Sequence, residues 1–530
     1  MSITLTFHGA AGCVTGFCAR LQTPAATILI DCGMFQGSKT LKALNYDDFP
    51  FDPASIDAVL LTHAHIDHSG LLPKLMKAGF KGPIYATAAT RDLCAVMLAD
   101  AGGIQESEVR HLNRRNLQRG RPPIEPIYTE RDAAKLMKQF EKVKLGVEAS
   151  VAPGIEAVFW EAGHILGSSS IEVMVDTGEE GWMRLLFSGD LGGGGSDYVP
   201  DPEGPSGADH LIVESTYGDR ERPVLDGPAR RAMLAKELLD AHAAGGPLLI
   251  PAFALERSQE LLVDLMALMD EGEVPKAEIF LDSPLAIAAT EVFLHRGWNR
   301  ATGRNPFQDL HIGERLKFLR TPADSDRLDR LSGWHVIMAA SGMCDAGRVR
   351  KHLKRLLWKR QATVLLSGYQ AAGTLGRILQ GGARNVSIQG EPIQVRARIR
   401  SLDVYSGHAD ADGLVNWVKA RLPVRGKVFL AHGEPDSLQG LRERLLNIGI
   451  AEGAVEIPAL DSHYRLSGDV VESEAGPARL SSETPARADW HNRRARLLLD
   501  LDARLDALPD DAAREALLRK LLEDLERRAA

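Results

Sequence analysis

The chain repeats short apolar runs that end on polar or glycine-containing turns. Such runs occur at residues 27–30, 58–62, 184–187 and 210–213, and each has the length and composition of a buried β-strand. Segments with helical spacing lie between several of them, as after residue 70. This alternation predicts an α/β fold, in which polar residues just beyond strand ends are placed to carry chemistry.

The rhythm changes between about residues 220 and 390. Apolar runs at 247–251, 278–281, 336–339 and 362–366 are separated by long segments with room for helices. This order predicts βαβ units and therefore a parallel sheet. Later segments at 403–408 and 427–432 return to the earlier style, which indicates one domain inserted into another. We expect a first domain in two parts, 1–215 and 393–468, around an inserted domain at 216–392.

The tail, residues 469–530, has a different composition. Residues 477–489 are polar and suit a linker. Leucines then recur at helical spacing on both sides of Pro509, which predicts a helical hairpin after the linker. Its apolar stripe is interpreted in two ways, as a face that packs on its own chain or as a contact for a homodimer or another protein.

Composition narrows the class of protein. The chain has 530 residues, 44% of them hydrophobic, which is ample for more than one core. None of its apolar stretches is long enough to span a bilayer, and its start lacks the charged region and cleavage site of a secretory signal. The five cysteines are scattered and odd in number, so we expect a reduced, cytoplasmic protein that does not act at a membrane.

The net charge of −8 argues against a surface coated for nucleic acid. Basic residues are nevertheless clustered in three places, and local patches of this kind can bind a polyanion in a salt-sensitive way. Solvated helix faces explain the same clusters equally well, so both interpretations stay open. The clusters are Arg110–Arg121, Arg348–Arg360 and Arg396–Arg400.

Possible metal ligands are most concentrated in the hexapeptide His63-Ala64-His65-Ile66-Asp67-His68, directly after the apolar run 58–62. His63 and His65 alternate, so an extended segment points both at one metal ion. Asp67 and His68 follow as the chain turns and can reach a second ion. Imidazole suits zinc, and a carboxylate accepts zinc, iron or manganese. A solvated polar turn is the alternative, but the density of ligands favours a pair of metals.

These residues are similar to a known family. Together with Asp31, His164 and Asp190, the hexapeptide resembles the metallo-β-lactamase superfamily. Glu214, Ser406-Gly407-His408, Ala431-His432-Gly433-Glu434 and the inserted domain resemble its β-CASP branch, which contains RNA-processing nucleases. The resemblance covers about residues 1–465. It implies an αββα sandwich with an inserted parallel-sheet α/β domain, followed here by a C-terminal helical extension.

The resemblance implies a set of metal ligands for two Zn²⁺ ions per chain. Asp31 would hold a ligand imidazole from behind, which fixes its tautomer and raises its basicity. All the ligand positions of the family are filled in this sequence. The first ion would be bound by His63, His65 and His164, the second by Asp67, His68 and His432, and Asp190 would bridge them.

The resemblance also implies the catalytic residues. His408 would be the general acid, oriented by Glu214, and Asp67 would serve the reaction as a ligand. Phosphodiester cleavage needs an activated water, neutralisation of phosphate charge and a proton for the leaving oxygen, which two metals and one imidazole can supply. In the family, histidine at the position of His432 is typical of members that act on RNA, and the products carry 5′-phosphate and 3′-hydroxyl ends.

Candidate substrate-binding residues follow two strands of the inserted domain. Backbone N–H groups and hydroxyls at such strand ends can contact phosphates. Close helix–strand packing at the glycines is the alternative interpretation of the same sequence pattern. The candidates are Ser341, Gly342, Ser367, Tyr369, Gln370 and Arg377.

The sequence therefore predicts a metal-dependent ribonuclease that hydrolyses single-stranded RNA between its two domains. Two other functions stay open. One is hydrolysis of a small ester or lactone, which the hexapeptide allows. The other is an RNA-binding scaffold subunit without activity. Internal cutting and cutting from the 5′ end are both compatible with these residues.

Overall fold

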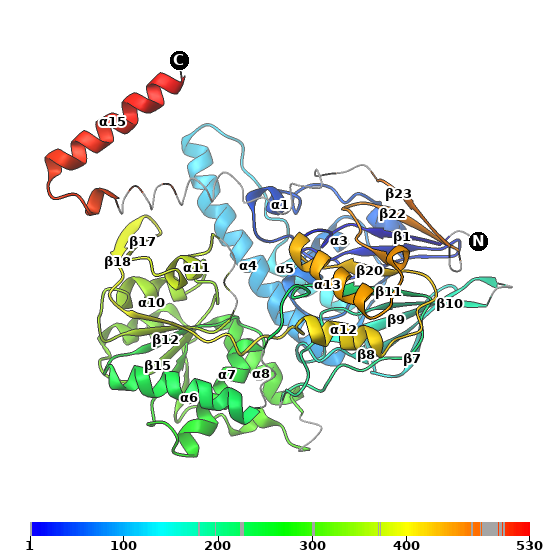
Figure 1. The fold of residues 1–530 in the computed structure, drawn as a ribbon, viewed down its shortest axis with the longest axis horizontal. Coiled ribbons are helices and arrows are strands. Elements are labelled where there is room, and N and C mark those ends of the chain that lie inside the picture. The colour runs from blue at the N-terminus through cyan, green and yellow to red at the C-terminus, as the bar shows by residue number, and fades with distance from the viewer. Residues whose placement is uncertain are drawn as a thin grey trace.

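The computed structural model describes residues 3–178, 181–196, 198–222, 227–298, 303–368, 370, 373–467, 470–476, 479, 497, 501 and 504–529. Figure 1 shows two bodies side by side, with the blue, teal and orange segments in one and the green and yellow segments in the other. Residues up to about 215 and the segment from about 402 to 476 build the first body, and the chain between them builds the second. This confirms the predicted insertion of one α/β domain into another.

Two mixed sheets face each other in the first body. The eight-stranded sheet has the order β23-β22-β1-β2-β3-β4-β5-β6, and the seven-stranded sheet has the order β21-β20-β11-β10-β9-β8-β7. The strands of the first sheet are β1 (Ile3–Phe7), β2 (Ala19–Gln22), β3 (Thr27–Ile30), β4 (Ala58–Leu60), β5 (Ile84–Thr87), β6 (Phe140–Val143), β22 (His463–Ser467) and β23 (Val470–Glu474). Those of the second are β7 (Glu148–Ala152), β8 (Ile155–Glu161), β9 (Ser169–Asp176), β10 (Trp182–Phe187), β11 (His210–Glu214), β20 (Val428–Ala431) and β21 (Val455–Glu456).

The apolar runs of the sequence are continuous because both faces of these strands are covered. In β3, Ile28 and Ile30 pack between the two sheets, whereas Leu29 packs with the helices on the outer face. In β4, Leu60 points inward and Val59 outward in the same way. Alternation along a strand sends successive side chains to opposite faces, so a strand that is buried on both sides needs apolar residues throughout.

Helices cover the outer faces of both sheets and complete an αββα sandwich. Leu414 and Trp417 of α12 and Leu441 of α13 pack on Leu211 and Leu430 of the second sheet. On the first sheet, α4 is the longest helix and also contacts α8 of the inserted domain (Figure 1). The helices are α1 (Lys39–Ala43), α2 (Ile66–Ser69), α3 (Leu72–Lys77), α4 (Ala88–Gln118) and α5 (Glu130–Leu136) for the first sheet, and α12 (Ala411–Lys419) and α13 (Pro435–Asn447) for the second.

The inserted domain is built on a parallel sheet with the order β14-β13-β15-β12-β16-β19. Helices lie on both of its faces, as βαβ crossovers require. Its strands are β12 (Leu248–Pro251), β13 (Ile279–Leu281), β14 (Leu316–Phe318), β15 (Val336–Ala339), β16 (Thr363–Leu366) and β19 (Arg398–Ser401), with a hairpin of β17 (Asn385–Ile388) and β18 (Glu391–Gln394). Its helices are α6 (Gly227–Ala243), α7 (Arg257–Asp270), α8 (Pro284–Arg296), α9 (Pro322–Arg327), α10 (Val349–Leu356) and α11 (Leu375–Gln380).

The end of the inserted domain at residue 392 stays a prediction, and one strand of its sheet comes from the chain beyond that residue. Strand β19 pairs in parallel with β16 from Arg398 to Ser401, so the chain leaves the inserted sheet only after that strand. Arg398 and Arg400 made this segment look like a basic cluster. An edge strand tolerates such side chains, because one of its edges is open to water and charge there discourages pairing with other chains.

The two bodies share one continuous hydrophobic core. Leu93 and Leu98 of α4 belong to the same cluster of buried side chains as Ile287 and Phe293 of α8. A buried ionic contact strengthens the junction, because Asp264 of α7 accepts hydrogen bonds from Arg230 Nε (3.0 Å), Tyr405 Oη (2.8 Å) and Tyr198 Oη. The inserted domain is thereby held in a defined position against the sandwich.

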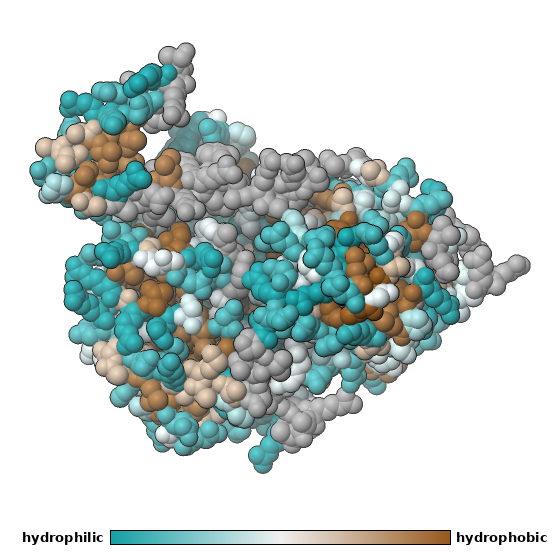
Figure 2. All heavy atoms as spheres, in the orientation of Figure 1, coloured by the Kyte–Doolittle hydropathy of each residue, from teal (hydrophilic) through white to brown (hydrophobic). Residues whose placement is uncertain are grey.

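The described part of the tail contains one long helix, α15 (Asp511–Ala529), which projects from the two bodies in Figure 1. The first arm of the predicted hairpin falls mostly outside the described residues. Leu518, Leu521 and Leu522 are exposed on α15, and Figure 2 shows apolar side chains over this part of the tail. A contact with a second copy or another protein stays a prediction. Within the described ranges, none of the helices has the length and apolar character to cross a membrane.

The core between the two sheets should dominate the stability of the sandwich. Phe429 is fully buried, and its ring centroid lies 5.6 Å from that of Phe7 and 4.9 Å from that of Tyr464. We expect Phe429→Ala to lower the free energy of unfolding by about 3–5 kcal/mol in urea titrations, because it leaves a cavity. Trp182→Ala removes an exposed aromatic from the same sheet and should cost at most about 0.5 kcal/mol. Equal losses for both variants would contradict this placement of the core.

Candidate metal centre

The candidate ligands follow strand ends in both sheets of the sandwich and lie in loops or in the short helix α2. His63, His65, Asp67 and His68 follow β4, and Asp190 follows β10. Because β10, β11 and β20 are parallel neighbours, their carboxyl ends meet at one edge. This brings Asp190, Glu214 and His432 together with the hexapeptide, and the turn between β8 and β9 adds His164.

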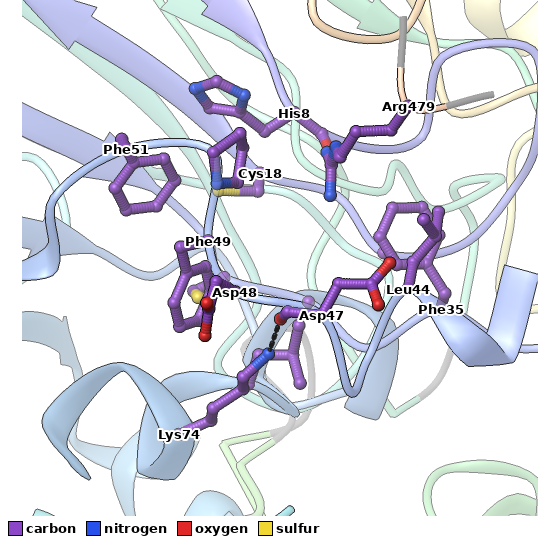
Figure 3. A pocket seen from close by; sticks show the side chains of 15 residues that line it. His8, Cys18, Phe35, Leu44, Asp47, Asp48, Phe49, Phe51, Lys74 and Arg479 are labelled. Atoms are coloured by element: carbon purple, nitrogen blue, oxygen red, sulfur yellow. Dashed lines mark hydrogen bonds between the residues drawn. The ribbon is translucent and has the colours of Figure 1, made fainter. Parts of the chain in front are cut away.

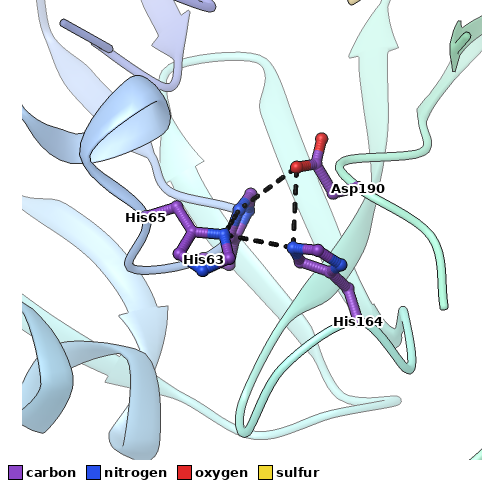
Figure 4. Close-up of side chains that lie close together, drawn as sticks. All are labelled: His63, His65, His164 and Asp190. Atoms are coloured by element: carbon purple, nitrogen blue, oxygen red, sulfur yellow. Dashed lines mark hydrogen bonds and ion pairs between the residues drawn. The ribbon is translucent and has the colours of Figure 1, made fainter. Parts of the chain in front are cut away.

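Four residues form the first ligand set, shown in Figure 4. His65 Nδ1 lies 3.2 Å from His63 Nε2 and 3.1 Å from His164 Nε2. Asp190 Oδ2 lies 3.5 Å from His63 Nε2 and 3.6 Å from His164 Nε2. A tetrahedral zinc ion with Zn–N distances of about 2.0–2.1 Å separates its ligand atoms by roughly 3.3 Å. The spacing of these atoms therefore fits one zinc ion.

The second set consists of Asp67, His68 and His432. His432 Nε2 lies 3.3 Å from His68 Nε2 and 3.7 Å from Asp67 Oδ2. Asp190 Oδ1 lies 3.3 Å from His68 Nε2, so the two oxygens of Asp190 face different sets. This buried Oδ1 accepts no hydrogen bond from the residues that the structure describes. A cation between the sets would compensate its charge more directly than the ion pair with His68, since a buried carboxylate oxygen without a hydrogen bond is unfavourable.

The protonation states of the first set suit metal binding. Burial lowers the pKa of His65 to about 4 and also lowers the pKa values of His63 and His164. These imidazoles are therefore neutral near pH 7 and each has a free lone pair. Metal ligands must be deprotonated, so little proton release is needed when a cation binds here.

The second set is more strongly charged. Burial raises the pKa of Asp67, but the hydrogen bond from His432 and the nearby His68 outweigh it and bring the pKa to about 2. Burial lowers the pKa of His68, yet Asp190 and Asp31 outweigh it and raise that pKa well above its usual value. Without a cation, His68 is protonated because it lies between two carboxylates. A metal ion would replace that proton.

Three polar groups hold the ligand rings in orientation. Asp31 Oδ2 lies 2.6 Å from His68 Nδ1, and Asp31 also accepts hydrogen bonds from the Thr62 N–H and hydroxyl, both at 2.7 Å. His164 Nδ1 donates to Gly407 O at 2.7 Å, and His432 Nδ1 lies 3.1 Å from the Thr216 hydroxyl. In each ring, Nδ1 is engaged and Nε2 faces the ligand set, which is how such partners fix the tautomer. Thr62 and Thr216 carry no sequence signal for this role.

His408 lies beside both ligand sets. Its Nδ1 is 3.2 Å from Glu214 Oε1, and Glu214 is held by the backbone N–H groups of Leu191 (2.8 Å) and Thr216 (3.2 Å). Burial lowers the pKa of His408, but the carboxylates of Glu214 and Asp190 outweigh it and raise that pKa. The ring centroids of His408 and His164 are 4.5 Å apart. A protonated imidazole thus stands next to the candidate metals.

The substrate-binding candidates lie at the carboxyl edge of the inserted sheet. Ser341 and Gly342 follow β15, and Ser367 follows β16. The Ser367 hydroxyl donates to Pro251 O at 3.0 Å, and the buried Gln370 amide donates to Gly342 O (3.1 Å) and Gly368 O (3.2 Å). Ser367 and Gln370 therefore join three loops through hydrogen bonds.

Arg377 takes no part in the hydrogen bonds that join these loops. It is exposed on α11, and its guanidinium donates to Gln380 Oε1 at 2.8 Å. Tyr369 lies outside the described residues.

A cavity elsewhere in the sandwich is too small to bind a nucleotide. It lies among the residues drawn in Figure 3 and has a volume of about 20 Å³, room for about one water. His8 Nδ1 and Arg479 Nε both contact Asp461 there at 2.7 Å, and Lys74 donates to Asn45 O at 2.9 Å. These contacts tie loops of the first sheet together and contribute no ligand to the candidate metal centre.

Family models match three consecutive parts of the chain. The metallo-β-lactamase superfamily model matches residues 11–236, the Beta-Casp domain model matches residues 258–379, and the model for a Zn-dependent metallo-hydrolase RNA specificity domain matches residues 392–456. Together they include all the candidate ligands as well as Glu214 and His408.

Known relatives match along most of the chain. Ribonuclease TTHA0252 of Thermus thermophilus is 35% identical over 82% of this chain and 94% of its own length. Transcription termination factor FttA of Cenarchaeum symbiosum is 30% identical over 82% of this chain and 66% of its own length, so this chain spans about two thirds of FttA. A crystal structure of a protein of unknown function from Enterococcus faecalis V583 has a similar fold, with a TM-score of 0.51 and 14% identity over 88% of this chain and all of that one.

Asp31 should act on metal affinity through His68. We expect Asp31→Asn to weaken metal binding about 10- to 100-fold in competition with a chelator, because the amide cannot hold His68 as the carboxylate does. Asp461→Asn is a matched control, since Asp461 forms a similar contact with His8 (2.7 Å) away from the ligands. It should leave metal affinity unchanged. Equal affinity of Asp31→Asn and the unmodified protein would contradict this role of Asp31.

Proposed function

The chain belongs to the metallo-β-lactamase superfamily and to its β-CASP branch, and from this premise we propose that it is a ribonuclease that hydrolyses phosphodiester bonds of single-stranded RNA with two zinc ions. The observation that carries the proposal is Asp190, whose two oxygens face two ligand sets of the right composition. The match to an RNA specificity domain model and the 35% sequence identity with ribonuclease TTHA0252 support RNA as the substrate.

The ligand sets would hold one zinc ion each. The first would be bound by His63, His65 and His164, the second by Asp67, His68 and His432, with Asp190 shared. Bound zinc supplies an activated water with a pKa of about 7 and neutralises charge on the phosphate. Asp31, Gly407 O and Thr216 keep the ligand rings turned toward the ions.

His408 would provide the proton for the leaving oxygen. Its Nδ1 is held by Glu214, so its Nε2 is the atom that can donate to the substrate. Glu214 stabilises the charged ring and fixes its direction, and its own position is set by two backbone N–H groups. Protonation of the 3′ oxygen at this place would leave a 3′-hydroxyl on one product and a 5′-phosphate on the other.

The inserted domain would bind the RNA strand along the carboxyl edge of its parallel sheet. Ser341, Gly342 and Ser367 offer backbone and hydroxyl groups there, and Tyr369 is the residue after Gly368 in the sequence. Gln370 would hold the loops in place, and the exposed Arg377 would contact phosphates farther along the strand.

Hydrolysis of a small ester and RNA binding without cleavage are the competing functions. Incubation with end-labelled RNA, single-stranded DNA and a chromogenic ester, each with and without chelator, separates them. The proposal requires chelator-sensitive cleavage of RNA above that of the other two substrates. Labels at either end of the RNA also distinguish internal cutting from cutting at the 5′ end.

Loss of a ligand should abolish cleavage. We expect close to two zinc ions per chain by elemental analysis, and loss of RNA cleavage in His65→Ala and Asp67→Asn, because each removes a ligand of one ion. His111→Ala is the control, since His111 is exposed on α4 and contacts only Ser107 O (2.8 Å) among the described residues. Full activity in His65→Ala or Asp67→Asn would reject the two-metal mechanism.

Loss of the general acid should slow turnover without loss of metal. We expect His408→Ala to reduce the rate of RNA cleavage about 10²–10⁴-fold, as is typical when a positioned acid is removed. Its zinc content should match that of the unmodified protein, because His408 is outside the two histidine-rich sets and instead lies with Asp190 and Glu214, where Glu214 engages its Nδ1. If His408→Ala loses zinc to the same extent as His65→Ala, then His408 is a ligand and the assigned role is wrong.

A further inference from the structure

We propose that Phe253 and Arg257 form a nucleotide subsite of the RNA site, in which Phe253 stacks on a base and Arg257 contacts a phosphate next to the scissile one. Both residues lie at the junction of β12 and α7, a segment to which sequence reasoning gave no role. The inference rests on the proposed function, because it takes single-stranded RNA as the ligand.

The segment lies between the inserted sheet and the metal centre. Strand β12 is central in the sheet, so its carboxyl end is flanked by the loops after β15 and β16. The turn also contacts the sandwich, since Glu256 Oε2 accepts a hydrogen bond from the Leu166 N–H at 3.2 Å. Leu166 is two residues beyond His164, a candidate ligand. Residues 253–257 thus border the place where a strand would enter the metal centre.

Phe253 is an aromatic ring held rigidly at the surface. Its side chain is 40% exposed, although it follows a fully buried strand. One edge packs on Gly342, because a Cβ at Gly342 would lie 2.9 and 3.0 Å from two of its ring carbons. The Ser258 hydroxyl fixes the backbone by donating to Phe253 O at 2.6 Å. A fixed, exposed ring can stack on any base, and this is how proteins bind single strands without reading sequence.

Arg257 has donors that the described residues leave unused. Its guanidinium donates to Ser367 O at 2.7 Å, and its buried Nε has no hydrogen-bond partner among those residues. Within the described part of the chain, no ion pair holds this guanidinium. Burial lowers the pKa of Arg257, and the carboxylates of Glu260 and Asp403 partly offset that decrease. Arginine carries five N–H donors, and a phosphate oxygen would satisfy those that remain.

Two glycines keep this place open. At Gly368, where φ is +137°, a Cβ would lie 2.9 Å from the Arg257 guanidinium, and a Cβ at Gly342 would collide with Phe253. Side chains at these positions would cover or displace both residues. The glycines at the strand ends therefore act by leaving room for Phe253 and Arg257, which explains them better than phosphate binding by their own backbone alone.

The subsite is adjacent to the general acid. The Arg257 guanidinium carbon lies 5.9 Å from the ring of Tyr405, which is three residues before His408. Tyr217 also lies close enough to Arg257 to interact with its charge. The ring centroid of Tyr217 lies 5.9 Å from that of His408. A phosphate on Arg257 would belong to a nucleotide close to the one that receives the proton from His408.

The test measures binding of a short single-stranded RNA in the full-length, zinc-loaded protein with His408→Ala to prevent turnover. In that background, Phe253→Ala should weaken binding about 5- to 100-fold, the value expected for one base stacked on an aromatic ring. Phe253→Tyr should bind as tightly as Phe253. An RNA with one abasic nucleotide beside the scissile bond should bind to the background protein more weakly than the intact RNA does. When Phe253 is also replaced by alanine, the abasic and the intact RNA should bind equally.

Arg257→Gln should weaken binding and lower the salt dependence, reducing the slope of log K against log salt by about 0.7, as loss of one phosphate contact requires. Arg257→Lys should restore the slope. Trp358→Ala and Arg330→Gln are matched controls, because both residues are exposed and precede β16 and β15, at the opposite edge of the sheet. Neither should change binding.

Several outcomes would overturn the inference. Unchanged binding in Phe253→Ala, or a loss that does not depend on the abasic nucleotide, removes the stacking role. Weaker binding in Arg257→Gln with an unchanged salt slope makes Arg257 a structural support of the loop after β16. If the protein with His408 intact cuts RNA but both variants bind normally, only the subsite is wrong. If that protein neither cuts nor binds RNA, the proposed function fails as well.

Discussion

The arrangement of the site depends on one carboxylate. Asp190 is buried at the end of β10 and presents Oδ2 to His63 and His164 but Oδ1 to His68. A carboxylate between two groups of imidazoles is stable only if its charge is compensated, since burial of an unpaired charge is costly. The ligands, the polar groups that orient their rings and the His408–Glu214 pair are all arranged around that requirement, so the sandwich is organised to hold positive charge at this point.

The inserted domain completes this arrangement from outside the sandwich. Asp264 accepts a hydrogen bond from Tyr405, three residues before His408, so one buried carboxylate of the inserted domain helps to place the loop of the general acid. The turn before α7 contacts the loop of His164 through Glu256. The domain that would bind the strand is therefore linked by direct contacts to two loops of the catalytic centre, and a shift of one would disturb the other.

Sequence could locate only part of this site. The hexapeptide alone predicts a metal site, because a pair of metal ions accounts for three imidazoles and a carboxylate within six residues better than a solvated turn does. His164, Asp190 and His432 stand alone in their local sequences, and only a resemblance to a family linked them before the strand order showed why they meet. Phe253 and Arg257 gave no signal at all, since an aromatic and a basic residue after a strand are common. The strand at Arg398–Ser401 was missed because its arginines fit an exposed edge as well as a loop.

The most direct test is a crystal structure of zinc-loaded protein with diffraction data on both sides of the zinc absorption edge. The account predicts two anomalous peaks about 3.5–4 Å apart, one on each side of the Asp190 carboxylate, each surrounded by its own set of ligands. A single peak, or peaks that lie away from Asp190, would contradict the claim that this carboxylate joins two metal sites.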